Sequence, residues 1–481
     1  MGSSEQSPAE GLLRKTVRST IWTFAGQQAT TVLALATSVA IGRLIDPSEL
    51  GRYALASGIA QLISTASTLQ AGGYYVVSPT ADARLLRTGL TLELGLGAGL
   101  FALTVGGGLI YGALQHDYGF SALLIASALV MLTNPFNSLD AWYSRRFDYG
   151  PPTVARTLCL VLSSLLKIGL LFAGMGAWAL VIGDVVVSAA YGLTMLVLIR
   201  DARGFALDRG YARRQLNYGI PSMAIGAMST ATVRGQDFIV AGVLGTRSLG
   251  FYYLAARLPN QVYQLARSLS MALLPAFSRA EGERLARAYA LVTRYSAFLI
   301  LFPLALAVPL AGPAIRLLYG PRWEPATDPL VLLMAAFAVR FVFWHLGNLM
   351  KSRNRVRELT PVMLVQFVAT MVACYLGARW FGLIGASAAV LGVELILVAP
   401  KVRLIRSVIP FDLGTILAEP LAALAISAAI AAGAAAWLPD GAAIAVGAVA
   451  STVVFGAAAI RSDPAFVQQV IASLRRAPRS A

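Results

Sequence analysis

The heptad "LGRYALA" (Leu50–Ala56) returns as "LGFYYLA" (Leu249–Ala255), 199 positions later, with Leu, Gly, Tyr, Leu and Ala in the same places. The composition of the chain indicates what kind of protein carries this repeat. Of its 481 residues, 57% are hydrophobic and 13% are charged, and the mean hydropathy is +0.69. A typical soluble domain is about one quarter charged. The composition therefore predicts an integral membrane protein.

Apolar stretches recur along the chain from Ser19 onwards, and each is long enough to cross a hydrocarbon core of about 30 Å as an α-helix. We predict an all-α fold with about fourteen transmembrane helices. Their ranges are 19–42, 53–77, 88–113, 119–140, 153–174, 177–199, 218–244, 250–275, 294–315, 328–350, 359–378, 382–400, 413–437 and 441–460.

Positive charge is distributed unevenly over the connecting segments. Lys and Arg collect on the cytoplasmic side of membrane proteins, and placing both termini in the cytoplasm puts most of the 39 Lys and Arg residues there. The net charge of +16 is thus explained by membrane orientation and contact with anionic lipid, without a nucleic acid partner. The first span is too long for a secretory signal and lacks a cleavage pattern, so we expect it to be retained.

The two heptads occupy equivalent places in this plan. Each begins the second helix of a pair after an outer turn, and six spans separate them, so the two halves point the same way, as in transporters built from parallel repeats. We predict alternating access around a central site. The predicted organisation is a cytoplasmic segment 1–18, an N-lobe 19–199 (spans 1–6), a basic linker 200–217, a C-lobe 218–404 (spans 7–12), an extra C-terminal helix pair 413–460 and a cytoplasmic tail 461–481.

Polar residues within the spans mark the candidate site. Arg257, Gln261 and Gln264 share one face of the eighth span, with Asn260 and Arg267 beside it, and Gln61 lies on the equivalent second span. Each intramembrane arginine costs about 2.5 to 3.5 kcal/mol on insertion scales, which favours a water-filled cavity and an anionic ligand. The competing interpretation is hydrogen bonding between helices.

Ion pairing is available to some of these charges within their own helix. Arg234 has Asp237 one turn away, whereas Arg257 and Arg267 have no acidic residue three or four positions away.

Five further charges lie within predicted spans. Asp184 and Glu394 are candidates for proton coupling, and they could equally pair with Lys167 or another cation across helices. Arg340 is expected to line the same cavity, and Glu93, near the start of its span, is expected near the membrane interface.

Several functions have no support in the sequence. Cys159 and Cys374 stand alone, without ligand-spaced neighbours, so we expect no disulfide, metal site or cofactor. There is no phosphate-binding glycine loop, and the loops are too short for a catalytic domain. We therefore expect a transporter and not an enzyme, with a transferase acting on polyprenyl-linked substrates as the alternative class.

The segment "RGQDFIVAGVLGTRSLGFYYLAARLPNQVYQLARSLSMALLPAFSRAEGE" (Arg234–Glu283) strongly resembles one region of bacterial polysaccharide flippases. These are the Wzx-type members of the multidrug, oligosaccharidyl-lipid and polysaccharide exporter superfamily. Matching positions in the seventh and eighth helices are Asp237, Gly245, Leu249, Gly250, Tyr252, Ala255, Arg257, Leu258, Pro275, Ser278 and Arg279. Residues 40–63, "AIGRLIDPSELGRYALASGIAQLI", are also similar to the family's first helix pair.

This resemblance implies that the substrate is an oligosaccharide repeat unit on undecaprenyl diphosphate, moved across the bacterial cytoplasmic (inner) membrane for exopolysaccharide, capsule or lipopolysaccharide synthesis. A polysaccharide polymerase and a chain-length regulator are implied partners. The expected diphosphate-binding residues are Arg257, Arg267, Arg234 and Arg340; the expected glycan-facing residues are Gln61, Asn260, Gln261 and Gln264; the expected coupling residues are Asp237, Asp184 and Glu394.

Three alternatives to this function remain. They are a flippase for lipid-linked peptidoglycan precursors, a multidrug exporter of the same superfamily, and a scaffold for polysaccharide assembly. Gly51 and Gly250 are expected to be turn or close-packing residues, and Tyr53 and Tyr252 are expected to anchor the helices at the membrane interface.

Overall fold

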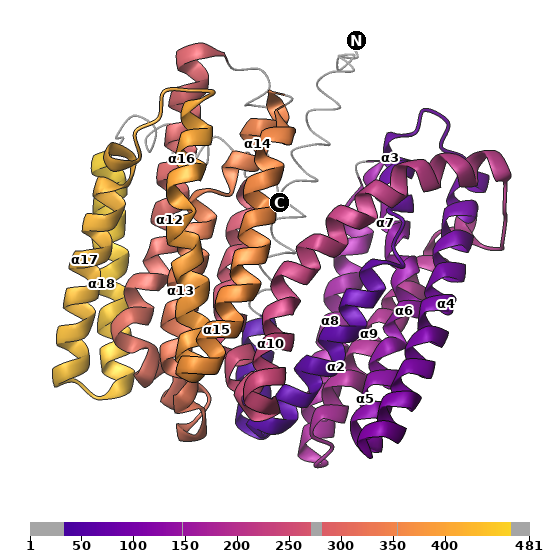
Figure 1. The fold of residues 1–481 in the computed structure, drawn as a ribbon, viewed down its shortest axis with the longest axis horizontal. Helices are drawn as coiled ribbons and strands as arrows, with labels where there is room; N and C mark the ends of the chain where they lie inside the picture. Colours follow the sequence, from indigo (N-terminus) through magenta and orange to yellow (C-terminus); the bar gives the residue numbers. More distant parts are fainter. Residues whose placement is uncertain (1–32, 147, 271–280, 354, 463–481) are drawn as a thin grey trace, which may run out of the picture. The chain divides into compact units, whose positions relative to one another are not determined.

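The computed structural model describes residues 33–146, 148–270, 281–353 and 355–462, and every regular element in these ranges is a helix. Contacts divide the chain into two compact units, one up to Gly250 (unit 1) and one from Phe251 (unit 2). Figure 1 shows both units as bundles of long helices.

Unit 1 contains the following helices, of which the last continues into unit 2: α2 (Pro47–Thr65), α3 (Ala71–Val77), α4 (Ala83–Gln115), α5 (Tyr118–Ala128), α6 (Val130–Thr133), η1 (Asn134–Leu139), α7 (Asp140–Ser144), α8 (Gly150–Phe172), α9 (Ala177–Leu198), η2 (Arg200–Ala202) and α10 (Arg209–Ser270). A further helical segment, Leu33–Leu44, precedes them. Asp46, Asp82 and Asp117 each cap a helix of this unit, accepting a backbone N–H of its first turn, as N-cap residues do.

Unit 2 contains α12 (Gly282–Leu318), η3 (Pro321–Ala326), α13 (Thr327–Val342), α14 (His345–Ser352), α15 (Val356–Ile396), α16 (Val398–Arg406), α17 (Leu413–Trp437) and α18 (Asp440–Ser462). Its buried core is formed mainly by α12, α13 and α14, with contributions from α15, α16, α17 and α18. The predicted C-terminal pair corresponds to α17 and α18, which pack against α12, and Gly447 lets α18 approach Leu310 closely.

Ten helical segments within the described residues are long and apolar enough to cross a membrane. Two of them, in α10 and α15, each overlap two predicted spans. The backbone leaves helical geometry at Gly245, between the two spans of α10, and at Gly382, the first residue of the second span of α15. In α15 a Cβ on Gly377 would lie 2.3 Å from the Gly385 carbonyl oxygen. Residues eight apart in a straight helix are separated by about 12 Å, so the two halves of α15 fold back on each other.

The first two predicted spans differ from the structure. Most of span 19–42 lies outside the described residues. Span 53–77 is not one helix, because it breaks between Thr65 and Ala71 into α2 and α3. The hydroxyls of Ser67 and Thr68 donate to the carbonyls of Ser64 and Thr65, which satisfies these groups without continuing the helix.

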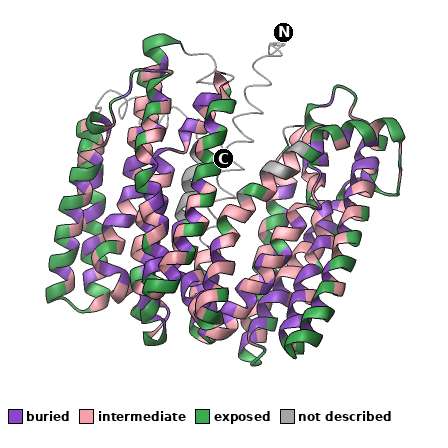
Figure 2. Cartoon of the chain, in the orientation of Figure 1, coloured by how far each residue is buried: buried purple, intermediate pink, exposed green. Residues whose placement is uncertain are grey.

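Burial follows the expected membrane environment. In Figure 2 buried and exposed residues alternate around the helices of each unit. The exposed positions include large apolar side chains such as Leu103, Leu114, Leu158 and Phe172 in unit 1 and Phe381 in unit 2. A helix that exposes such side chains while its backbone is internally hydrogen-bonded is suited to contact with lipid.

The two repeated heptads meet at their glycines. A Cβ on Gly51 would lie 1.7 Å from the carbonyl oxygen of Thr246, and one on Gly250 would lie 1.9 Å from that of Pro47. The contact is reciprocal, because each glycine faces the residue four positions before the other. The expected close packing of Gly51 and Gly250 is confirmed, and it needs glycine at both places.

The unit boundary at Gly250 lies later than the linker at 200–217, where the sequence placed the boundary between lobes. The first part of α10 packs on α2 and the segment after it. Thr230 and Thr65 share a hydrogen bond of 3.2 Å, Phe238 covers Gly58, and Gly219 lies against the Leu69 carbonyl. The predicted lobe boundaries remain a prediction.

Candidate functional site

A cavity of about 510 Å³ lies within unit 1, between α2, the α5–α6–η1 segment, α8, α9 and α10. Its walls are rich in hydroxyl and amide groups, which come from Ser57, Gln61, Ser64, Ser127, Asn134, Asn137 and Ser188. Three charged residues also line it, namely Arg156, Asp184 and Arg234. Apart from α2, each of these elements belongs to a segment long and apolar enough to cross a membrane, so the cavity can offer polar groups to a ligand within the membrane.

Arg234 joins two helices at the wall of this cavity. Its Nε donates to Oε1 of Gln61 on α2 at 2.7 Å, and its Nη1 donates to Oδ2 of Asp237 at 3.0 Å. The predicted pairing of Arg234 with Asp237 is therefore present. Asp237 is buried, so the pair compensates a charge that would otherwise be costly within the membrane.

Asp184 on α9 also has two partners. Lys167 on α8 donates to its Oδ1 at 2.5 Å, and the hydroxyl of Tyr53 on α2 donates to its Oδ2 at 2.6 Å. Gly183 makes room for the lysine, because a Cβ there would lie 2.3 Å from Lys167 Cγ. The sequence allowed two roles for Asp184, proton coupling and pairing with a cation such as Lys167. The structure shows the ion pair with Lys167.

The expectation for the two tyrosines of the heptads was wrong. Tyr53 and Tyr252 are buried within the protein, at 9% and 1% exposure, and are not exposed interface anchors. Tyr53 lines the cavity through its hydrogen bond to Asp184. A buried tyrosine needs a partner for its hydroxyl, and a carboxylate on a neighbouring helix supplies it.

Arg156 is a cavity residue that the sequence did not single out. Its Nη2 lies 2.6 Å from Oδ2 of Asp140, and its guanidinium stacks 4.8 Å from the ring centroid of Tyr191. The Tyr191 hydroxyl donates to the same carboxylate. Asp140 ends one predicted span and Arg156 lies near the start of the next. Opposite charges on the two sides of this connection, residues 141–152, are the sequence signal that could have identified the pair.

The predicted eighth-span stripe lies in the part of α10 that belongs to unit 2. Arg257 and Gln261 are partly exposed, and Asn260 is exposed. No hydrogen bond or ion pair joins Arg257 to any residue that the structure describes. The side chains of Gln264 and Arg267 lie outside the described residues, so their predicted roles stay predictions.

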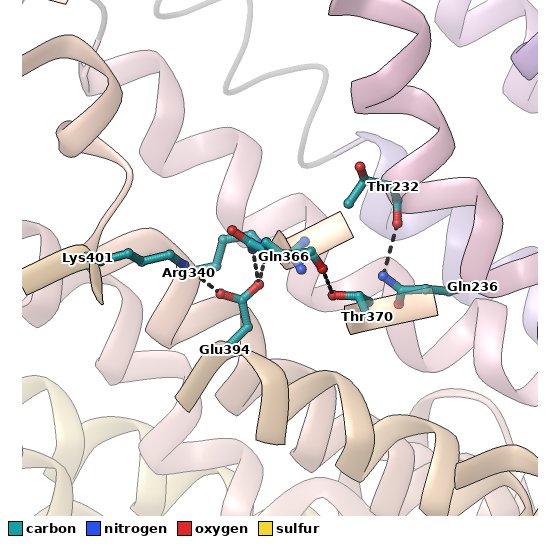
Figure 3. A network of polar contacts seen from close by, with 7 residues as sticks. All are labelled: Thr232, Gln236, Arg340, Gln366, Thr370, Glu394 and Lys401. Atoms are coloured by element: carbon teal, nitrogen blue, oxygen red, sulfur yellow. Dashed lines mark hydrogen bonds and ion pairs between the residues drawn. The ribbon is translucent and has the colours of Figure 1, made fainter. Parts of the chain in front are cut away.

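Arg340 and Glu394 lie together in unit 2 (Figure 3). Glu394 accepts from Arg340 Nε at 2.7 Å, from Gln366 Nε2 at 2.7 Å and from Lys401 Nζ at 3.0 Å. Glu394 and Lys401 are almost fully buried. The cluster links α13, α15 and α16, and it gives Glu394 the paired state that the sequence left open.

Glu93 is buried within the protein, and its expected position near the membrane interface stays a prediction. It is 1% exposed, and its Oε1 accepts from the backbone N–H of Ala71, the first residue of α3. The break between α2 and α3 creates this free N–H, and the sequence pattern did not reveal the break.

The fold is that of membrane transporters of the MOP superfamily. The chain superposes on a structure titled "Lipid II flippase MurJ, inward closed conformation" with a TM-score of 0.74 at 12% identity, covering 95% of this chain and 100% of that one. A MOP superfamily transporter from Pyrococcus furiosus gives a TM-score of 0.53 at 14% identity, covering 82% and 94%. An inward-facing multidrug resistance MATE family transporter gives 0.50 at 16% identity, covering 81% and 95%. Sequence identities of 12% to 16% show a shared fold and do not show a shared substrate.

A family model described as "Polysaccharide biosynthesis protein" matches residues 14–328, which is more than half of the chain, and the chain belongs to this family. It is also similar to the succinoglycan biosynthesis transport protein ExoT of Rhizobium meliloti (strain 1021), with 24% identity over 332 residues. That match spans 66% of this chain and 66% of ExoT, slightly under two thirds of its length. The resemblance to Wzx-type flippases is thus confirmed: the chain belongs to a polysaccharide biosynthesis family and has the fold of MOP superfamily transporters.

Proposed function

We propose that the protein is a flippase that moves oligosaccharide repeat units, linked to undecaprenyl diphosphate, across the bacterial cytoplasmic membrane by alternating access. In this proposal both termini lie in the cytoplasm. The glycan and diphosphate of such a substrate cannot cross hydrocarbon without a polar path, because each unsatisfied polar group there is costly. A polysaccharide polymerase and a chain-length regulator would act on the product.

The observation that carries this proposal is the cavity of unit 1. Its volume of about 510 Å³ lies within the usual range for small-molecule sites. Hydroxyl and amide groups on its walls can exchange hydrogen bonds with sugar hydroxyls, and Gln61, which was predicted to face the glycan, lines it. The MATE-type alternative, a drug exporter, does not need this density of hydrogen-bonding groups around two arginines.

Arginine suits the diphosphate because its planar guanidinium can donate two parallel hydrogen bonds to phosphate oxygens. Arg257 is the strongest candidate, since it is partly exposed and has no partner among the described residues. We keep Arg267 with it on the basis of the sequence. Arg234 and Arg340 already hold Asp237 and Glu394, so either would need to exchange a carboxylate for a phosphate.

Glycan contacts are proposed for Asn260, Gln261 and Gln264 together with Gln61. Coupling to an ion gradient is proposed for the carboxylates Asp237, Asp184 and Glu394. Asp184 is the one of these three that lines the cavity, where an arriving substrate or proton can compete with Lys167 for it.

One alternative substrate has a specific observation in its favour. The likeness to the lipid II flippase extends over 95% of this chain, so a lipid-linked peptidoglycan precursor is the second candidate. Both substrates carry a diphosphate and sugars, and both require the same arginines. The glycan that accumulates when the protein is absent separates them.

The test replaces Arg257 by Ala in the native host and measures exported polysaccharide and lipid-linked intermediates. Arg247→Ala is the matched control, because Arg247 lies ten positions earlier on the same helix and is exposed. We expect Arg257→Ala to abolish export at normal protein levels and Arg247→Ala to leave it intact. Equal export by both variants would remove Arg257 from the substrate site.

A further inference from the structure

Glu93 is a buried carboxyl group that has no role in the transport function proposed above. It lies on α4, and within unit 1 it faces the start of α3. Oε1 accepts the Ala71 N–H at 3.0 Å, whereas Oε2 is buried and has no hydrogen-bond partner among the described residues. The Ser138 hydroxyl and the Leu69 backbone also lie close to the carboxyl group, but neither meets the geometry of a hydrogen bond to Oε2, and the Ser138 hydroxyl donates to the carbonyl of Pro135.

A second unsatisfied acceptor lies on the same side of α4. The amide of Gln215, on α10, packs against Gly89, which is one turn before Glu93. Gln215 is 1% exposed; its Nε2 donates to the Leu85 carbonyl, and its Oε1 has no partner among the described residues. Gly89 and Glu93 are four positions apart and share one face of α4. Two buried oxygens without a donor therefore lie along this face: Oε2 of Glu93 itself and Oε1 of Gln215, which packs on Gly89.

No cation in the described part of the chain pairs with Glu93. The charged groups on α4 and on the elements packed against it have other partners or are exposed. Arg84 pairs with Asp208, Arg87 donates to the Asp201 carbonyl, and Asp82 accepts from Tyr211. On α2, Arg52 pairs with Asp117 and Glu49 accepts the Ala177 N–H; Arg200 on η2 and Arg213 and Arg214 beside Gln215 are exposed. Further away, Arg145 donates to the carbonyls of Tyr75, Val76 and Ser78, and Arg156 pairs with Asp140. Asp237, Asp184 and Glu394 differ from Glu93 in this respect, because each has a cation within 3.0 Å.

Burial of a carboxylate without a cation is strongly unfavourable, and such a group takes up a proton in preference to remaining charged. A protonated carboxyl group also has a hydrogen on one oxygen, which supplies the donor that this buried face lacks. A metal ion would need several oxygen ligands around it, whereas a proton needs only the carboxyl group.

We propose that Glu93 is a proton-binding site of unit 1, at the junction of α2 and α3. Given the transport function proposed above, this proton is the coupling ion of the cycle. The site is placed to act on the backbone, because Glu93 holds the first N–H of α3 next to Gln70, whose φ of 52° is unusual for a residue other than glycine. Gain or loss of the proton therefore changes the contact that fixes α3 after the break.

The direct test is infrared spectroscopy of the purified full-length protein in lipid nanodiscs. A protonated carboxylic acid has its own carbonyl stretch, distinct from the bands of a carboxylate. We expect this band in the wild type at neutral pH and its loss in Glu93→Gln. Glu49→Gln is the matched control, because Glu49 also accepts a helix N-terminal N–H, that of Ala177, yet is only partly buried; it should retain the band.

Two further readouts distinguish proton binding from simple helix capping. Glutamine mimics the neutral acid, so the melting temperatures of Glu93→Gln and wild type should agree at low pH, and the wild type should become less stable as pH rises. A constant difference at every pH, or no protonated band in the wild type, would overturn the proposal. A response of the wild type to Na⁺ in place of N-methyl-D-glucamine, lost in Glu93→Gln, would overturn it in favour of Na⁺.

Transport measurements separate this site from the proposed function. Wild-type flipping that responds to a pH gradient, and Glu93→Gln flipping that does not, would agree with both proposals. If neither protein flips lipid-linked glycan while the band depends on Glu93, the proposed function fails and the proton site stands. If both flip with the same pH response, the site fails and the proposed function stands.

Discussion

Replacing Glu394 should cost much more stability than replacing Lys401, although both residues are almost fully buried. Glu394 is the only acid among the four residues of its cluster and neutralises two cations, Arg340 and Lys401. Glu394→Gln removes the carboxylate shared by the buried Lys401 and the partly buried Arg340, so the cluster keeps two positive charges and no negative one. Lys401→Met leaves the pair between Glu394 and Arg340, which is neutral as a whole.

The magnitudes follow from this charge count. Removing one partner of a buried ion pair typically costs about 3 to 5 kcal/mol, because the other charge is left uncompensated, and Glu394→Gln should fall in this range. Lys401→Met loses one hydrogen bond but also removes the cost of burying an ammonium group, so its effect should be about 1 kcal/mol.

Reversible unfolding in mixed micelles, followed by tryptophan fluorescence, measures both free energies of unfolding. Leu→Ala at an exposed lipid-facing position such as Leu114 controls for general effects of substitution. Equal losses for Glu394→Gln and Lys401→Met would refute the reasoning. Such a result would mean that Arg340 is not committed to Glu394 and is available for the diphosphate, as the sequence predicted.

Further predictions concern close contacts and the cavity. Gly51→Ala should reduce the yield of monodisperse protein in size-exclusion chromatography, because its Cβ would meet a backbone oxygen, whereas Gly99→Ala, in open space on a helix, should leave the yield unchanged or improve it. Gly183→Ala should lower the free energy of unfolding in the wild type but much less in a Lys167→Ala background, and equal effects would contradict the packing of the lysine on this glycine. Arg156→Met should reduce glycan export at normal protein level, with Arg156→Lys restoring only part of it; full export by Arg156→Met would exclude the residue from substrate binding.

The helical fold and the positions of the main helix breaks were predictable from the sequence. Runs of apolar residues identify spans because a membrane allows few alternatives to a helix. Gly245 lies between two predicted spans and Gly382 begins one, and both adopt positive φ angles that favour glycine. The heptad repeat also led to the close approach at Gly51 and Gly250, where shared sequence reflects a shared packing requirement.

Features that depend on contacts between distant segments were not predictable. The break after Thr65 follows from hydroxyl groups that satisfy local carbonyls, and such groups occur within intact spans as well. Glu93 was expected near the membrane interface because it lies near the start of a predicted span, and Arg156 was not singled out at all. Only the fold shows that α3 covers the first and that Asp140 pairs with the second. Partners across helices decide whether an intramembrane charge is compensated, and a single sequence does not specify them.

The most direct test of the proposed function is the distribution of lipid-linked glycan between the two leaflets in a strain that lacks the gene. A membrane-impermeant probe applied to intact spheroplasts labels the outer leaflet alone. The proposed flippase predicts accumulation in the inner leaflet, reversed by the wild-type gene but not by the Arg257→Ala variant. Normal display of the glycan in the outer leaflet, without the gene, would contradict the proposal.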